Sequence, residues 1–164
     1  MLPLAENQIR SSFINASVRE RNNLNLPENF ESLDWDSLDF LGWRDRKYPA
    51  VGYAIAWVDG APVGVLFRHA EGRMRARAQC AWCADVTLPN EVVYFTAKRS
   101  GRAGRNGNTV ATLMCTNFQC STNVRRPAPP AYIGFDVEAA RQERMAGLKA
   151  HVQSFMRNMV NGAD

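Results

Sequence analysis

Two short segments, Cys80-Ala-Trp-Cys83 and Cys115-Thr-Asn-Phe-Gln-Cys120, contain all four cysteines of this 164-residue sequence. Two residues separate the cysteines of the first pair, four separate those of the second, and 31 residues lie between the pairs. Four thiolates from two short loops are a common ligand set for a tetrahedral zinc ion. We therefore expect Cys80, Cys83, Cys115 and Cys120 to bind one structural Zn²⁺ ion.

Other uses of the cysteines fit the sequence less well. Two disulfides would need an oxidising compartment, and residues 1–7 lack the basic and apolar segments of a secretory signal. A redox dithiol at Cys80 and Cys83 would leave the second pair unexplained, and no alternating β/α pattern follows it. His69 and His151 are alternative metal ligands, but four cysteines make them unnecessary. Because four thiolates leave the metal no open position for water or substrate, we expect a protein that is not an enzyme.

The charge of the chain is unevenly distributed. Residues 1–60 contain six Lys/Arg and nine Asp/Glu, whereas residues 61–164 contain fourteen Lys/Arg and seven Asp/Glu. The cysteine-bearing part is therefore basic, which favours an acidic partner such as RNA or an acidic protein face; ordinary solvation is the alternative. No run of 18 apolar residues is present, so we expect a cytoplasmic monomer with no membrane partner.

The first part of the chain is expected to be a small helical appendage. Ile9, Phe13 and Ala16 share one face of an amphipathic helix over residues 4–21. Residues 34–43 are expected to form one or two helical turns closed by Gly42. We assign residues 1–44 to this appendage and residues 45–164 to the zinc-binding domain.

Two β-hairpins are predicted around the first cysteine pair. The first joins residues 51–58 to 62–67 through Asp59-Gly60, a pair that tolerates the positive φ values of a tight hairpin turn. The second joins residues 92–98 to 109–114. Its connection, residues 99–108, is rich in glycine and arginine, so we expect a mobile basic loop.

Two helices are predicted after the hairpins. A short one over residues 118–124 carries Cys120, and a long one runs from an N-cap at Asp136 to about Val160 with one buried stripe. A zinc knuckle at Cys80–Cys83, a β-hairpin, and a strand that leads into a helix are the parts of a treble-clef zinc finger. The predicted fold is therefore α+β: a treble-clef zinc finger whose β-hairpins pack against a long C-terminal helix, with a short N-terminal helical appendage.

The cysteine motifs, the basic glycine-rich connection and Gly107-Asn108 ahead of Cys115 resemble the elongation factor G-binding protein family, the FusB-type fusidic acid resistance proteins and their relatives. The resemblance covers roughly residues 45 to 160. It implies a non-enzymatic treble-clef protein that binds elongation factor G. Such proteins promote the release of this factor from ribosomes on which fusidic acid has trapped it.

The resemblance also implies a partner-binding surface. It places an aromatic residue of the knuckle, here Trp82, and a basic residue ahead of the third cysteine, for which Arg102 and Arg105 are the nearest candidates, at this surface. We expect an exposed Trp82 near these arginines and near Lys98 and Arg99, which fits an interface anchor. The alternative for Trp82 is burial against the hairpin beneath it. The alternative function is direct binding of RNA or the ribosome through the basic loop.

Overall fold

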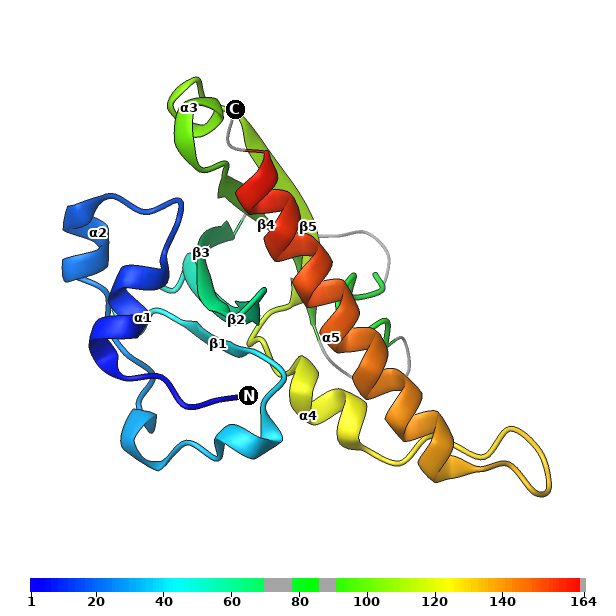
Figure 1. Cartoon of the computed structure of the whole chain (residues 1–164). Coiled ribbons are helices and arrows are strands. Elements are labelled where there is room, and N and C mark those ends of the chain that lie inside the picture. Colours follow the sequence, from blue (N-terminus) through cyan, green and yellow to red (C-terminus); the bar gives the residue numbers. More distant parts are fainter. Residues whose placement is uncertain (70–77, 86–90, 163–164) are drawn as a thin grey trace.

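The computed structural model of the protein describes residues 1–69, 78–85 and 91–162. Within these residues one antiparallel sheet has the strand order β1-β2-β3-β4-β5 (Figure 1). The elements in chain order are α1 (Glu6–Ser12), α2 (Val18–Asn22), the 3₁₀ turns η1 (Phe30–Ser32) and η2 (Trp35–Ser37), β1 (Leu41–Arg44), β2 (Val51–Val58), β3 (Ala61–His69), β4 (Val92–Lys98), α3 (Gly101–Arg105), β5 (Thr109–Cys115), α4 (Cys120–Arg125) and α5 (Val137–Asn161).

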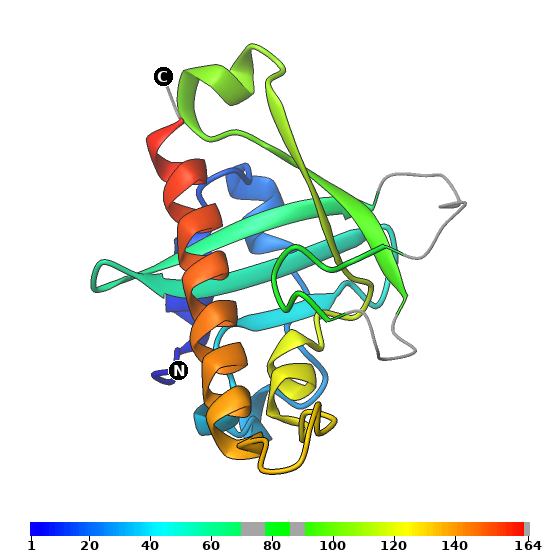
Figure 2. The same ribbon diagram turned by 90° about the vertical axis from the view of Figure 1, so that its right-hand side faces the viewer.

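The first three strands have a buried cluster on each face. Successive side chains of a strand point to opposite faces, so Tyr53 and Ile55 of β2 join a cluster with Ile9 of α1, and Ala54 and Ala56 join a second one. The second cluster also contains Trp82, the cysteines and the buried residues of α5. Figure 2 shows α5 across one side of β2 and β3, with the N-terminal helices behind them. The sheet is therefore the middle layer of three.

Both predicted hairpins are confirmed. In the turn between β2 and β3, Asp59 has φ 50° and Gly60 has φ 84°, as a two-residue type I′ turn requires. In the second hairpin, Lys98 pairs with Thr109 at one end and Val92 with Cys115 at the other. The described pairs between β3 and β4 are confined to Arg68 with Thr96 and His69 with Phe95, and the two hairpins run in different directions in Figure 2.

The predicted single helix over residues 4–21 is wrong, because the chain leaves the helix at Phe13. Phe13 forms a β-bridge with Gly64, and the N–H of Ile14 donates to the Gly64 carbonyl at 3.0 Å. The Asn15 side chain then bonds both the N–H and the C=O of Leu66. A new helix, α2, starts after its N-cap Ser17, whose hydroxyl accepts from the Glu20 N–H in a capping box. Contacts with β3 therefore outweigh the local helical pattern.

Two further expectations about local structure are corrected. Gly42 does not close a helix, because it lies in β1 opposite Ala54. Residues 99–108, which we expected to be a mobile basic loop, contain the short helix α3. This short helix is attached to the C-terminal end of α5: the Ser100 hydroxyl donates to the Met159 carbonyl at 3.0 Å, and Arg99 Nη1 donates to the Asn158 carbonyl at 3.1 Å.

The two helices after the second hairpin are found where the sequence places them. Cys120 is the first residue of α4, and Asp136 caps α5 by accepting from the Ala139 N–H at 2.8 Å. The buried residues of α5 run from its middle to its C-terminal end and are Leu148, Val152, Met156 and Met159. The predicted α+β treble-clef fold is therefore confirmed. No helix in the described residues is long and apolar enough to cross a bilayer.

Candidate metal centre

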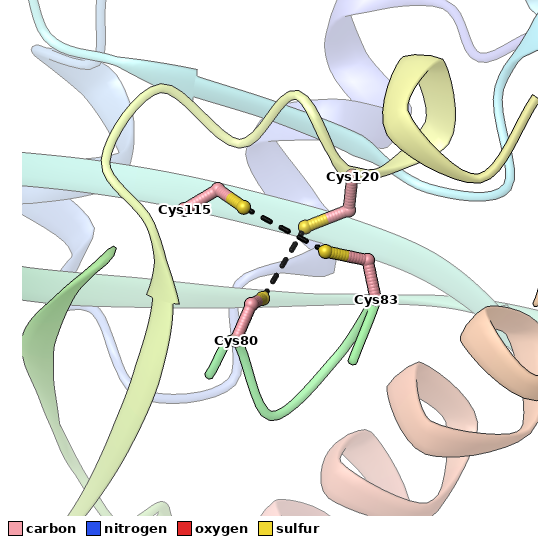
Figure 3. A group of neighbouring side chains, drawn as sticks. All are labelled: Cys80, Cys83, Cys115 and Cys120. Carbon is pink, nitrogen blue, oxygen red and sulfur yellow. Dashed lines mark hydrogen bonds between the residues drawn. The ribbon is translucent and has the colours of Figure 1, made fainter. Parts of the chain in front are cut away.

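The four cysteines converge at one buried point between the knuckle, the end of β5 and the start of α4 (Figure 3). Their Sγ atoms all lie within 4.8 Å of one another, and the Cys80–Cys120 and Cys83–Cys115 separations are both 3.7 Å. Four sulfurs at 2.3 Å from a tetrahedral zinc ion are about 3.8 Å apart. The cluster therefore fits one zinc ion, with no coordination position left for a substrate.

A tight turn in the knuckle orients the Sγ atoms of Cys80 and Cys83 toward the same point. The N–H of Ala84 donates to the Cys80 carbonyl at 2.9 Å, and Ala84 has a positive φ of 54°. The N–H of Ala81 donates to the Leu113 carbonyl of β5 at 2.8 Å. The turn therefore brings Cys80 and Cys83 together, and the bond to β5 sets them opposite the second pair.

The second cysteine loop is fixed on the sheet through Phe118. This residue has a positive φ of 57°, and its N–H donates to the Cys115 carbonyl at 3.0 Å. Its buried side chain lies over Gly42 of β1 and Gly52 of β2: an added Cβ atom would be 2.7 Å from Phe118 Cβ at position 42 and 2.6 Å from Phe118 Cζ at position 52. Two glycines in neighbouring strands thus leave the space that Phe118 fills.

Asn123 is a site residue that the sequence analysis missed. Its side chain is fully buried, and its Nδ2 atom lies 3.5 Å from Cys115 Sγ and 3.9 Å from Cys83 Sγ. Outer groups of this kind orient the ligands of a metal and tune their electron density. The available signal was its position: Asn123 follows Cys120 by three residues and so lies on the same side of α4.

The electrostatics of the cluster favour a bound dication. Hydrogen bonds from Cys115, Cys120 and Cys83 lower the pKa of Cys80. The pKa of Cys120 is instead raised by hydrogen bonding with Cys115, Cys80 and Cys83 and by burial. One thiolate is therefore stabilised by its neighbours, but further negative charge in the buried cluster is opposed. A zinc ion compensates this charge, which couples metal binding to folding.

The expected exposure of Trp82 is wrong. Its side chain is 2% exposed and its ring lies among those of Phe40, Phe155 and Phe67, with centroids 4.9, 5.6 and 6.1 Å away. The Trp82 carbonyl is 2.9 Å from Nδ1 of His151 on α5, so this histidine contacts the knuckle backbone. Trp82 therefore packs in the core and holds the knuckle against it. This agrees with the alternative interpretation, in which Trp82 is buried.

The basic candidate residues lie at the other end of the second hairpin. Lys98 is opposite Thr109, six residues along the strand from the Val92–Cys115 pair, which is a distance of about 20 Å. Lys98 is exposed, and so are Arg102 and Arg105 of α3. Arg99 is partly buried against α5. The structure brings these four cations together at the α3 end and does not place them beside Trp82.

Comparison with known proteins identifies the protein family to which this chain belongs. It matches the family described as the FBP C-terminal treble-clef zinc-finger over residues 8–159. The chain therefore belongs to this family, and the resemblance inferred from the cysteine motifs is confirmed. The match crosses the expected boundary at residue 44, where β1 ends. The division into residues 1–44 and 45–164 stays a prediction.

Among solved structures, the chain is similar to that of the fusidic acid resistance protein FusC. The sequence identity is 16% and the TM-score is 0.49; the similarity covers 79% of this chain and 53% of FusC. The chain thus spans about half the length of FusC. No curated protein matches the chain.

Proposed function

We propose that this protein binds elongation factor G through its zinc-finger domain and modulates the release of that factor from the ribosome, in the cytoplasm and as a monomer. The observation that carries the proposal is the family match, which spans residues 8–159 and includes all four cysteines. A role of the fusidic acid resistance type follows from the same family relationship.

A binding role, without catalysis, is supported by the metal centre. All four thiols of the cluster point at one another and are buried. A zinc ion with four protein ligands has no position at which to activate water or polarise a substrate. Its contribution is to hold the knuckle, β5 and α4 together, so the metal stabilises a surface.

The open face of the second hairpin supplies the surface that best fits a protein partner. Tyr94 and Lys98 are both exposed and lie four residues apart on β4, so they share one face. Tyr94 is 48% exposed and is the aromatic residue that takes the anchoring role expected of Trp82. Arg102 and Arg105 of α3 extend the surface beyond Lys98. We therefore place the partner-binding site at Tyr94, Lys98, Arg99, Arg102 and Arg105.

Titration calorimetry with purified elongation factor G and the zinc-loaded protein tests this proposal. We expect one-to-one binding that Tyr94→Ala weakens by roughly tenfold or more, since an interface aromatic is commonly a hot spot, and that Arg102→Gln weakens less. Tyr132→Ala is the matched control, because Tyr132 is 68% exposed and precedes α5. No binding of the factor by the intact protein would refute the proposal.

A further inference from the structure

Two neighbouring cavities lie beside α2 and α3, which are labelled in Figure 1, and share part of their lining. The first, of about 580 Å³, reaches from the α1–α2 connection to α3, and the second, of about 700 Å³, reaches from α2 to the β1–β2 turn. Both are lined by Leu66 and by Glu20 and Arg68, an ion pair at 3.2 Å. We call the two together the basic groove.

The basic groove has a strong excess of positive charge. Two carboxylates, Glu20 and Asp45, line it, and both already accept hydrogen bonds from the protein: Glu20 from Ser17 and Arg68, and Asp45 from Tyr53. Six Lys and Arg side chains and two carboxylates line the groove, so the lining has a formal charge of +4, which equals that of the whole chain. An anionic ligand is therefore favoured. The cations are Arg19, Lys47, Arg68, Lys98, Arg99 and Arg105.

The lining of the basic groove also contains an exposed aromatic ring and neutral polar side chains, which are not required for binding an acidic peptide. Tyr48, at the β1–β2 end, is 57% exposed, and Lys47 Nζ lies 5.6 Å from its ring centroid. An exposed aromatic ring beside cations is the combination that binds unpaired bases and phosphates. Asn23 and Thr109 add neutral polar side chains to the lining, and such groups can bond a ribose 2′-hydroxyl.

We propose that the basic groove binds single-stranded RNA, with phosphates at Arg68, Lys98 and Arg105 and one base stacked on Tyr48. A duplex would keep its bases stacked within the helix and offer none to Tyr48. This inference goes beyond the binding of elongation factor G, although the two proposed sites share Lys98 and Arg105. It depends on the cavity and its charge, and its test uses no elongation factor.

Fluorescence anisotropy with a labelled oligouridine of roughly ten nucleotides tests the proposal on the zinc-loaded protein. Contact with three phosphates predicts that log K falls with log salt with a slope of about −2. Arg105→Gln is expected to weaken binding by about threefold to tenfold and to make this slope shallower. Arg102→Gln, on the same short helix but outside the cavity lining, is the matched control and is expected to change little. Equal weakening by both variants would overturn the assignment to the groove.

The aromatic contact and the ligand class are tested in the same assay. Tyr48→Ala is expected to weaken binding by about tenfold and Tyr48→Phe to retain it, because stacking needs the ring and not the hydroxyl. An unlabelled oligothymidine of equal length is expected to compete less well than oligouridine. Competition by polyglutamate as effective as that by RNA would contradict the proposal in favour of an acidic protein. Absence of RNA binding at low salt would also overturn it.

Discussion

The ring of Phe118 lies directly on the backbone of Gly52, so close that a Cβ atom at position 52 would be 2.6 Å from the Cζ atom of Phe118. Phe118 belongs to the loop between Cys115 and Cys120, and Gly52 belongs to β2. The contact therefore joins the metal centre to the middle of the sheet. It explains why two glycines interrupt adjacent strands, since Gly42 of β1 meets the same ring.

Gly52→Ala is predicted to displace Phe118 and to loosen the second cysteine loop. We expect a loss of about 1–3 kcal/mol in the free energy of unfolding, as for overpacked cores, together with faster transfer of zinc to a chelator. Denaturant titration and a colorimetric chelator assay measure the two effects. Gly147→Ala is the matched control, because nothing lies within 4 Å of its Cβ position, and an alanine within α5 should be neutral or slightly stabilising. Unchanged stability of Gly52→Ala would contradict this role of Phe118.

The parts of the fold that were predictable from sequence have local signals. The Asp59-Gly60 turn, the cysteine spacings and the Asp136 cap each specify their structure within a few residues. The break after Phe13 was not predictable in this way, because it depends on pairing with Gly64, which is 51 residues further along the chain.

The same limit applies to the site. The four cysteines were predicted as a set because metal ligands occur in recognisable spacings. The burial of Trp82 was not, since it depends on Phe40, Phe67 and Phe155, which come from three distant segments. Asn123 had one local signal, its position three residues after Cys120 on the predicted helix, but its approach to Cys115 Sγ depends on where the folded chain places α4.

Asn123→Ala is predicted to weaken zinc binding more than it weakens the fold. The protein should contain about one zinc ion per chain, and loss of an outer hydrogen bond to the ligands typically costs about 10- to 100-fold in metal affinity. Competition with a chelator of known affinity measures this change. Asn117→Ala, at an exposed position of the same region, should leave the affinity unchanged. Equal affinities for the two variants would remove Asn123 from the metal centre.

Trp82→Ala is predicted to destabilise the protein by about 3–5 kcal/mol, because it empties a large space in a buried aromatic cluster. Trp82→Phe should lose less, since a smaller ring still fills part of that space. Thermal or denaturant unfolding measures both variants. A Trp82→Ala protein that keeps its stability but no longer binds elongation factor G would instead restore Trp82 as an interface residue.

Asp45 is predicted to make stability depend on pH in the acid range. Burial opposes its charge, but hydrogen bonds from the Tyr48 N–H, the Tyr53 hydroxyl and Asn25 outweigh burial and lower its pKa below 3.8. A lowered pKa in the folded state stabilises the fold above about pH 4, and this contribution is lost as the pH falls through the folded-state value.

Asp45→Asn should therefore be less stable than the wild type at pH 7, by about 1–3 kcal/mol. The difference should shrink as the pH falls below about 4. Unfolding free energies measured from pH 7 down to pH 3 test this, with the exposed Asp34→Asn as the control that should follow the wild type. A difference that stays constant over this range would show that the charge of Asp45 is not the cause.

The most direct test of the central claim is the release of elongation factor G from ribosomes stalled with fusidic acid. The complexes are incubated with the zinc-loaded protein and pelleted, and the factor is quantified in both fractions. We predict that the factor moves to the supernatant in proportion to the added protein, and that Tyr94→Ala reduces this release. Elongation factor G that stays in the pellet at saturating concentrations of the intact protein would contradict the account.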